Sequence, residues 1–341
     1  MRTKPSLATA SKNSISGPCQ PPNGLGNKPL GKAWCRTVAS LLTLVVAGTA
    51  CVSAQAADPV ASNLKHSYLV LGGKTAIIGE DGTAQWEYAG GSRDGFVLPN
   101  GNVLIAYTDK VEEVTRDKQV VFSYKRSKEN GEIGTTQRLY NGNTLITEEG
   151  SKPRLMEVDP QGKIVVDVPL QPETDNTHMQ TRMARQLRNG NYLVPHLLAF
   201  AVKEYAPDGR VVSSLKTDFD EFGGRKAETW PFTAIRLDNG NTLVSLTHGN
   251  RVAELNLKGE IVWKVTNEDV GGLFQDPCGS QRLASGNTVV GSHAASKGIS
   301  MVELTPEKKI VWTSDHPLAS GVHHFQILTT NGKAEPGMPM K

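Results

Sequence analysis

Cysteine is scarce in this sequence, and its distribution excludes one class of fold. Three of the four cysteines, Cys19, Cys35 and Cys51, lie within the first 56 residues, and only Cys278 lies beyond them. One cysteine cannot form an internal disulfide bond, so a small disulfide-stapled fold is excluded. A hydrophobic core must therefore stabilise the rest of the chain.

Long apolar runs are also missing. The apolar segment 37–50 (TVASLLTLVVAGTA) is too short to span a bilayer stably. Lys32 and Arg36 precede it, and a small-x-small sequence, AQA, ends at Ala56. This order of basic, apolar and small residues is typical of a secretory signal peptide. We therefore expect residues 1–56 to be a cleaved signal peptide, with no membrane span and a periplasmic or secreted mature protein.

An excess of positive charge is absent once this segment is set aside. The segment holds six of the 37 Lys and Arg residues and none of the 34 Asp and Glu residues, so 31 basic residues remain and the net charge becomes −3. Proteins attract nucleic acids through basic surfaces. The composition therefore argues against nucleic acid as a partner.

The remaining chain repeats one phrase. NGNTLVSLTHGNRVAELNLKGEIVW at 239–263 returns as SGNTVVGSHAASKGISMVELTPEKKIVW at 285–312. Each unit has a turn, then a strand with a central glutamate, then a bulky or formerly bulky closing site. The turns begin at Asn100, Asn141, Asn189, Asn239, Ser285 and Asn331. The glutamates are Glu113, Glu157, Glu204, Glu254 and Glu303, with Ile77 in the first unit. The closing sites are Trp86, Phe122, Val166, Ser213, Trp263 and Trp312.

Each unit is interpreted as four short strands, A to D. Asn-Gly tolerates the positive φ values that tight hairpins need, so it joins strands A and B, and a second glycine-containing turn joins strands C and D. Alternating apolar residues mark each run as sheet. Four antiparallel strands repeated every 41 to 50 residues predict a β-propeller.

The two ends of the repeat predict ring closure. The first unit begins with SYLVL, KTAII and TAQWEY as strands B, C and D, and the last strand, HHFQIL, is a lone strand A. Pairing them removes an exposed sheet edge. We therefore predict an all-β, six-bladed β-propeller of four-stranded antiparallel blades, closed by the N-terminal strands pairing with the C-terminal strand. It should span 66–333, with a linker at 57–65 and a flexible tail at 334–341.

The phrase NGNTLV followed by R-V-x-E-L-x-x-x-G-x-I-V-W resembles the repeat of bacterial PQQ-like β-propellers, including the arylsulfotransferase-like group. The resemblance covers about 66–333 and implies the architecture. Quinoprotein dehydrogenases of this kind have eight blades and adjacent cysteines above the quinone. Six units and one remaining cysteine therefore argue against PQQ as a cofactor. WD40 repeats fit less well, because Lys264 and Thr313 follow the tryptophans in place of Asp.

The strand order assigns sequence positions to faces of the disc. The loops before strand A and between strands B and C lie on one face, and strand A is innermost. Of the eight histidines beyond residue 56, only His66 lacks such a placement. The other seven are His178, His196, His248, His293, His316, His323 and His324. We expect a histidine-rich polar pocket on that face.

Further candidates share this rim. Arg182 and Trp230 open strands A, and Glu148 and Tyr107 match the position of His196 in blades three and two. The predicted catalytic residues are His196, His293, His324 and Arg182. The predicted substrate-binding residues are His178, His248, His323, Trp230, Glu148 and Tyr107. The repeat glutamates and tryptophans are interpreted as packing positions, and Cys278 as an inert buried residue.

The predicted pocket would bind a small anionic or sugar-like substrate, and the residue types allow catalysis. An arylsulfotransferase-like enzyme would use a neutral histidine as nucleophile or base, with Arg182 holding the anionic oxygens. A metal-dependent lyase or hydrolase on carbohydrate would bind a divalent metal through His196, His248, His293 and His324, with Glu148 as carboxylate or base. No H-E-x-x-H spacing is present, so such ligands would come from separate blades. A non-enzymatic scaffold is the third hypothesis. The sequence leaves the reaction, the metal and the oligomeric state open.

Overall fold

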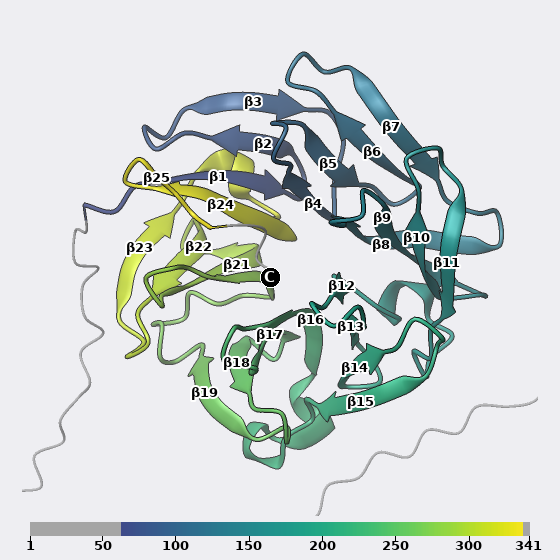
Figure 1. Ribbon diagram of the computed structural model, residues 1–341. Coiled ribbons are helices and arrows are strands. Elements are labelled where there is room, and N and C mark those ends of the chain that lie inside the picture. Colours follow the sequence, from purple (N-terminus) through teal and green to yellow (C-terminus); the bar gives the residue numbers. More distant parts are fainter. Residues whose placement is uncertain (1–62, 337–341) are drawn as a thin grey trace, which may run out of the picture. The chain divides into compact units, whose positions relative to one another are not determined.

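The computed structural model describes residues 63–336, and the expected signal peptide lies outside this range. The described strands form six antiparallel sheets around a central axis (Figure 1). Helical structure in this range is limited to short 3-10 turns: η1 (Thr177–Met179), η2 (Asp220–Phe222), η3 (Gly224–Ala227) and η4 (Pro317–Ala319). None of the described helical turns approaches the length and apolarity that crossing a membrane requires.

Five blades are consecutive four-stranded meanders. Blade two contains β4 (Asp94–Val97), β5 (Val103–Ala106), β6 (Lys110–Val114) and β7 (Val120–Lys125). Blade three contains β8 (Asn130–Arg138), β9 (Thr144–Gly150), β10 (Arg154–Val158) and β11 (Ile164–Pro169). Blade four contains β12 (Arg185–Gln186), β13 (Tyr192–His196), β14 (Ala201–Tyr205) and β15 (Val211–Lys216). Blade five contains β16 (Thr229–Arg236), β17 (Thr242–His248), β18 (Arg251–Leu255) and β19 (Ile261–Thr266). Blade six contains β20 (Pro277–Arg282), β21 (Thr288–Ser296), β22 (Ile299–Leu304) and β23 (Ile310–Ser314).

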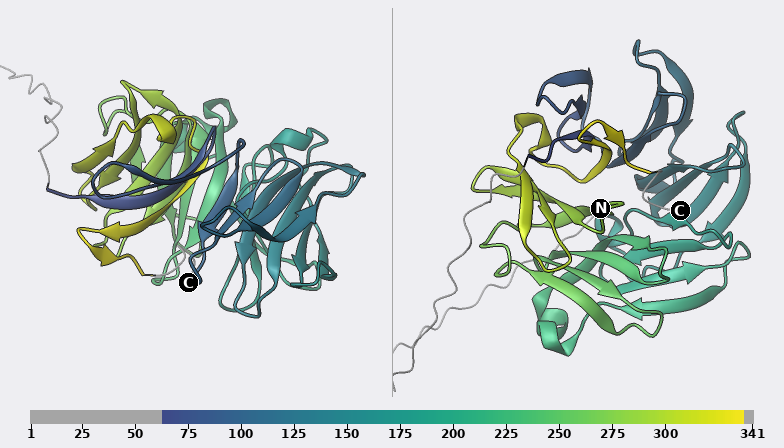
Figure 2. Two further views of the ribbon diagram at one scale, coloured as in Figure 1. Left: turned by 90° about the horizontal axis from the view of Figure 1, so that it is seen from above. Right: turned by 60° about the vertical axis from the view of Figure 1, so that its left-hand side comes forward.

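Blade one closes the ring as the sequence predicts. Its strands are β24 (His324–Thr330), β1 (His66–Leu71), β2 (Thr75–Ile78) and β3 (Ala84–Tyr88). β1 pairs with β24 from His66 opposite Thr330 to Leu71 opposite His324, and both lie side by side in Figure 2. The predicted six-bladed architecture is confirmed.

The C-terminal end of the described chain adds one feature that the repeat pattern does not show. A short strand, β25 (Lys333–Ala334), pairs with β24 and makes blade one five-stranded. The Glu335 amide donates to the Leu328 carbonyl at 2.9 Å. The first residues of the segment 334–341 therefore pack on the blade, and residues 337–341 lie outside the described range.

The strand register explains why the repeat pairs a glutamate with a closing site. In every blade these two positions face each other across strands C and D. The pairs are Ile77 with Trp86, Glu113 with Phe122, Glu157 with Val166, Glu204 with Ser213, Glu254 with Trp263, and Glu303 with Trp312.

Each repeat glutamate links two neighbouring blades. Glu254 accepts hydrogen bonds from the side-chain amides of Asn239 (3.1 Å) and Asn241 (2.7 Å) in its own A–B turn, and from Arg282 of the next blade (2.8 Å). Corresponding bonds from the next blade are Arg138 to Glu113, Gln186 and Tyr192 to Glu157, Arg236 to Glu204, and His66 to Glu303. These glutamates are structural, because their oxygens are used in holding the ring together.

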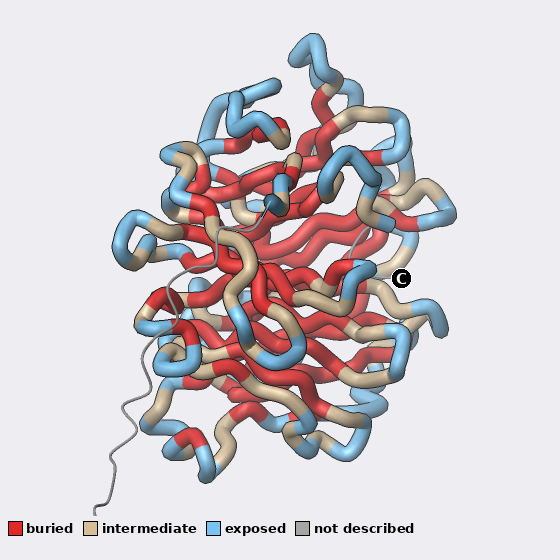
Figure 3. Tube along the Cα trace, turned by 90° about the vertical axis from the view of Figure 1, so that its left-hand side faces the viewer, coloured by how far each residue is buried: buried red, intermediate tan, exposed pale blue. Residues whose placement is uncertain are grey.

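The core lies between adjacent blades and along the inner strands. The buried segments in Figure 3 follow the inner and middle strands, and exposure concentrates in turns, loops and the outermost strands such as β7 and β15. Gly291 shows how tightly the inner strands pack. A Cβ atom at this position would lie 2.9 Å from the ring of Phe325 on β24, so only glycine fits. The inner strands consequently bring the residues at their entry points close together.

Candidate functional site

We call the face formed by the loops before strands A and by the B–C loops the upper face. All seven histidines assigned to it by sequence lie in or beside these loops. The residues at the upper end of the inner strands nevertheless differ from the predicted set. A group of six side chains, one from each blade, lies there and is here called the mouth cluster: Arg93, Glu132, Arg182, Phe232, His293 and His323.

One side of the mouth cluster is charged. Arg93, in the loop before β4, forms an ion pair with Glu132 at the start of β8. His178 lies 3.0 Å from the same carboxylate through Nδ1. Burial raises the pKa of Glu132, but the His178 hydrogen bond and the charges of Arg93 and Arg182 outweigh it and lower the pKa to about 2. Glu132 is therefore ionised at any physiological pH.

The other side of the mouth cluster is aromatic. The rings of Phe232 and His323 are stacked, with centroids 6.1 Å apart and planes 11° apart. His293 lies against His323 at 4.6 Å. The guanidinium carbon of Arg182 is 5.9 Å from the Phe232 ring, within reach of a cation–π interaction. The arginine thus connects the aromatic side to the charged side.

His323 and Arg182 are both desolvated. Burial lowers the pKa of His323 to about 3, with further lowering from His293, Arg93 and Arg182. The ring is therefore neutral, and its Nδ1 atom is buried with no hydrogen-bond partner among the described residues. Arg182 donates to the carbonyl of Thr181 at 2.6 Å and to that of His178. Burial lowers the pKa of Arg182, opposed mainly by the nearby Glu149.

Glu149, at the end of β9, is a buried carboxyl group beside this cluster. Its Oε1 accepts hydrogen bonds from the hydroxyls of Thr147 (2.9 Å) and Thr181 (2.6 Å). Its Oε2 is buried and has no partner among the described residues. A Cβ atom at Gly134 would lie 2.4 Å from Oε1, so that glycine leaves the space the carboxyl group fills. Burial raises the pKa of Glu149 to about 7, although Arg182 opposes the shift.

A small apolar group adjoins the mouth cluster through Phe232. Met183, Phe232 and Cys278 pack together, and the Thr233 hydroxyl donates to the Cys278 carbonyl at 2.6 Å. Burial raises the pKa of the Cys278 thiol to about 12. The thiol therefore stays protonated, in keeping with the inert role expected from the sequence.

A buried ion pair joins the first strands of blades two and four. Arg185 donates two hydrogen bonds to Asp94, at 2.6 and 2.7 Å, and both side chains are almost fully buried. His324 Nε2 lies 3.7 Å from Asp94 Oδ1. Burial lowers the pKa of His324 to about 4, partly offset by Asp94. His324 is therefore a buried neighbour of this ion pair. It is adjacent to His323 in the sequence but is not a member of the mouth cluster.

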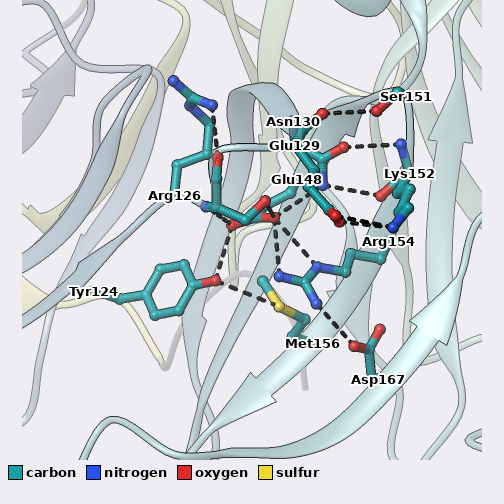
Figure 4. Close-up of polar contacts among 11 residues, drawn as sticks. Tyr124, Arg126, Glu129, Asn130, Glu148, Ser151, Lys152, Arg154, Met156 and Asp167 are labelled. Atoms are coloured by element: carbon teal, nitrogen blue, oxygen red, sulfur yellow. Dashed lines mark hydrogen bonds and ion pairs between the residues drawn. The ribbon is translucent and has the colours of Figure 1, made fainter.

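Glu148, predicted as a ligand-binding residue, lies in a structural network instead (Figure 4). Its carboxylate accepts hydrogen bonds from Tyr124 (2.8 Å), the Ser127 backbone (2.7 Å), Asn130 (2.9 Å) and Arg154 (3.1 Å). Burial raises its pKa, and these hydrogen bonds outweigh that effect and lower it. The carboxylate is fully buried and its oxygens are occupied within the blade.

Two further predicted residues also lie inside the fold. His196 is fully buried, its Nε2 atom 3.0 Å from the Tyr205 hydroxyl, and burial lowers its pKa well below the usual value. Tyr107 packs in the core between blades one and two, with its hydroxyl 3.5 Å from the Ala89 carbonyl. Neither contacts the mouth cluster in any recorded interaction.

The remaining predicted residues lie in two outer positions on the upper face. The rings of His248 and Trp230 are in contact, with centroids 4.3 Å apart and planes tilted by 35°, and Glu228 lies 3.2 Å from His248. His316 caps η4 by accepting a hydrogen bond from the Leu318 amide. Each position is half-exposed and separate from the mouth cluster.

The structure does not bring the four proposed metal ligands together. Within residues 63–336, no three His, Cys, Asp or Glu side chains are arranged to hold a metal ion. His196 and His324 are buried in different places, and His248 lies in the outer Trp230 pair. His293 is the one member of this set in the mouth cluster.

Two cavities adjoin the inner strands. The larger, about 670 Å³, lies between the B–C loop of blade three and the loop before blade four, and Thr177 and Gln180 line it. His178, between these two residues in the chain, contacts Glu132 of the mouth cluster. The turn η1 therefore borders both. A smaller cavity of about 240 Å³ lies at the lower-face turns of blades four and five, with Arg188 and Arg236 in its lining.

Four residues at or beside this cluster are not among those predicted from the sequence: Arg93, Glu132, Glu149 and Phe232. A signal for Arg93 exists, because it enters strand A of blade two just as Arg182 precedes strand A of blade four. Alternation along a strand places Glu148 and Glu149 on opposite sides, but it does not show which of the two faces the mouth. Phe232 and Glu132 carry no distinguishing pattern in the repeat.

Comparison with known proteins places the chain in a family. The family model described as Mal s 1 allergenic protein-like matches residues 78–297, more than half of the chain. No curated protein matches the sequence. These comparisons do not confirm the resemblance to arylsulfotransferases or other PQQ-like propellers.

Several solved structures share the fold. A protein of unknown function from Bacteroides caccae is 25% identical, with a TM-score of 0.67 over 76% of this chain and 98% of that one. Streptogramin B lyase is 10% identical, with a TM-score of 0.54 over 75% of this chain and 86% of that one. A catalytically inactive virginiamycin B lyase from Staphylococcus aureus, solved with quinupristin, is 13% identical, with a TM-score of 0.55 over 77% of this chain and 92% of that one. At these identities the two lyases show a likeness of fold alone. On the match of the family model across four complete blades, this six-bladed propeller belongs to the Mal s 1 allergenic protein-like family.

Proposed function

We propose that the protein binds a small, carboxylate-bearing, sugar-like ligand at the mouth cluster. The observation that carries this proposal is an unbalanced charge. Two guanidinium groups, Arg93 and Arg182, act on the same neutral ring of His323, and Glu132 is the one carboxylate within the cluster. Arginine binds carboxylates through paired hydrogen bonds, so this surplus favours an anion.

The uncharged part of the cluster suits the rest of such a ligand. The Nδ1 atom of His323 has no partner among the described residues and can exchange a hydrogen bond with a hydroxyl group. Phe232 offers an aromatic face beside it. The lining of the 670 Å³ cavity beyond η1 includes two prolines together with hydroxyl, amide and carboxylate side chains, and these polar groups suit the hydroxyl groups of a sugar.

A hexuronate tests this proposal. D-glucuronate should bind saturably at pH 6 in calorimetric titrations, and D-glucose, which lacks the carboxylate, should bind far more weakly. Arg182→Met and Arg93→Met should each weaken glucuronate binding by about tenfold or more, because each removes a charged hydrogen-bond donor. Arg188→Met is the matched control, because Arg188 is exposed on the lower face and paired with Asp238. Equal binding of glucose and glucuronate, or an equal loss in the control, would refute the proposal.

Group transfer is a second candidate function, favoured by the neutral state of His323 at the mouth. His323 stays unprotonated at neutral pH, as a nucleophile or general base must, and the more exposed His293 lies against it. An arylsulfotransferase-like reaction would place the sulfuryl oxygens near Arg182. With phenol as the acceptor of the sulfuryl group, release of p-nitrophenol from p-nitrophenyl sulfate should then be lost in His293→Ala and retained in His316→Ala. Absence of turnover in the unaltered protein would leave binding as the function.

Export remains part of the proposed function. The signal peptide expected at 1–56 rests on the sequence pattern alone. Expression of the full chain in a bacterium, followed by fractionation and N-terminal sequencing, should give a periplasmic or secreted protein that begins at Ala57. A cytoplasmic protein with an uncleaved N-terminus would contradict it.

A further inference from the structure

We infer that Glu149 makes anion binding at the mouth cluster proton-linked, so that the ligand binds tightly when this carboxyl group is protonated and weakly when it is ionised. This inference rests on the proposed function, since it concerns the same site. Glu149 does not contact solvent, because both its oxygens are buried. It therefore acts on the ligand through its charge and through Arg182 rather than by direct contact.

The surroundings of Glu149 leave its ionised form poorly compensated. It receives hydrogen bonds from two threonine hydroxyls, Thr147 on its own strand and Thr181 on the loop before β12. No described Lys, Arg or His forms an ion pair or hydrogen bond with it. The charged groups that act on it are Arg182, on the same loop, and Arg93, on the loop before β4. On strand β8, Gly134 lies against the carboxyl group, and the ionised Glu132 is the register partner of Glu149.

The charge balance of the site then depends on Glu149. Arg93 and Arg182 carry two positive charges, and Glu132 carries one negative charge, which is held close to Arg93 and His178. With Glu149 protonated, one positive charge remains for a ligand carboxylate. With Glu149 ionised, the four groups are neutral overall. Opposite charges in a partly desolvated site interact strongly enough for this difference to decide affinity.

The direction of the pH effect follows from thermodynamic linkage. Burial raises the pKa of Glu149 to about 7, so its protonation changes across the neutral range. A bound carboxylate favours the protonated form, and by reciprocity binding takes up a proton above neutral pH. Affinity for an anion should therefore fall by about tenfold between pH 6 and pH 8.

The test is the affinity of D-glucuronate at pH 6, 7 and 8 for three proteins. The unaltered protein should lose about tenfold in affinity across this range. Glu149→Gln should bind with the pH 6 affinity at all three values, because glutamine imitates the protonated acid. Glu112→Gln is the matched control. Glu112 is a buried carboxylate with one unpartnered oxygen, held by Lys110 on blade two, and its loss should leave the pH dependence intact.

The possible outcomes separate the two proposals. If the unaltered protein and Glu149→Gln share the same pH dependence, other groups such as the histidines cause it and the inference is wrong, while the binding site stands. If no protein binds glucuronate at any pH, the proposed function fails and the inference fails with it. A measurement without ligand also tests whether Glu149 changes its protonation state in this pH range. The infrared band of a protonated carboxyl group should be lost between pH 6 and 8 in the unaltered protein and be absent from Glu149→Gln.

Discussion

Glu148 and Glu149 are consecutive residues on β9 whose carboxylates have opposite surroundings. Glu148 is held by hydrogen bonds from Tyr124, Ser127, Asn130 and Arg154, which lower its pKa. Glu149 receives two threonine hydroxyls, and burial raises its pKa to about 7. Successive side chains of a strand point to opposite sides. Glu148 therefore forms hydrogen bonds within its blade, and Glu149 faces the arginines of the mouth cluster.

This difference predicts how stability responds to alkaline pH. Glu149 has a pKa in the folded protein above the ordinary value of 4.5, so the folded state binds the proton more tightly than the unfolded chain. Its contribution to stability is present at low pH and is lost as the pH rises from 4.5 through 7. Glu149→Gln should therefore stabilise the protein at pH 8 by about 2–3 kcal/mol and change little at pH 4.5. Urea unfolding at both values measures this, and an equal effect at both would contradict it.

The neutral buried histidines predict the opposite behaviour in acid. His324 has a folded pKa of about 4, below the ordinary value of 6.5, because of burial. Between these values the unfolded chain binds a proton that the folded state does not, so stability falls as the pH drops from 6.5 to 4. His324→Gln should reduce this loss by about 3 kcal/mol at pH 4. Thermal unfolding at pH 4 and pH 7 checks it; the same acid sensitivity in the variant would refute the assignment.

The fold could be predicted from the sequence because its signals are repeated. The Asn-Gly turns, the glutamates and the closing sites recur in register, and each glutamate faces its closing site across strands C and D. The split first blade likewise predicted the pairing of β1 with β24. Repetition allows weak local patterns to support one another, and this is what fixes the blade count.

From the sequence, the candidate site could be assigned only to one face of the propeller and not to particular residues on it. The repeat places His196 and Glu148 in equivalent positions, and both were predicted to line the pocket, but both are buried within their blades. What the sequence cannot show is which of two neighbouring side chains turns towards the axis when the strand end is irregular. β8 and β9 have register shifts between Asn130 and Glu132 and between Ile133 and Thr135, next to Glu149. Such register shifts change the side of the sheet to which a side chain points, and the sequence pattern does not reveal them.

The interblade glutamates predict a structural role that one substitution can measure. Glu254→Ala removes the acceptor for Asn239, Asn241 and Arg282 at once. Leaving these donors unpaired should cost about 1–3 kcal/mol of unfolding free energy. Glu260→Ala on the exposed C–D turn of the same blade is the control and should change stability by less than about 0.5 kcal/mol. Equal effects of the two substitutions on the unfolding free energy would show that the hydrogen bonds of Glu254 do not stabilise the fold.

Breaking the buried ion pair of Asp94 and Arg185 should cost more unfolding free energy than removing an interblade glutamate. Asp94 and Arg185 are buried together, and Asp94 also accepts from the Thr136 amide at 3.0 Å. Asp94→Asn leaves the Arg185 charge buried without a counter-charge, which should cost about 3–5 kcal/mol. The double variant Asp94→Asn with Arg185→Met should recover part of this loss. Chemical denaturation of the three proteins tests it, and a single variant as stable as the unaltered protein would contradict it.

The large cavity should make binding affinity depend on the size of the ligand. Thr177 on η1 lines it, and a tryptophan there would fill part of the space beside the mouth cluster. Thr177→Trp should weaken D-glucuronate binding by about tenfold and leave acetate binding nearly unchanged, because acetate needs only the arginines. Parallel titrations with both anions provide the test. Equal weakening of both would show that the cavity takes no part in binding.

A crystal structure of the protein grown with D-glucuronate at pH 6 tests the central claim most directly. The proposed site predicts the carboxylate within hydrogen-bond distance of the Arg93 and Arg182 guanidinium groups, with the sugar ring beside Phe232 and His323. Density for the ligand at the lower-face cavity beside Arg236, or none at the mouth cluster at a saturating concentration, would contradict it.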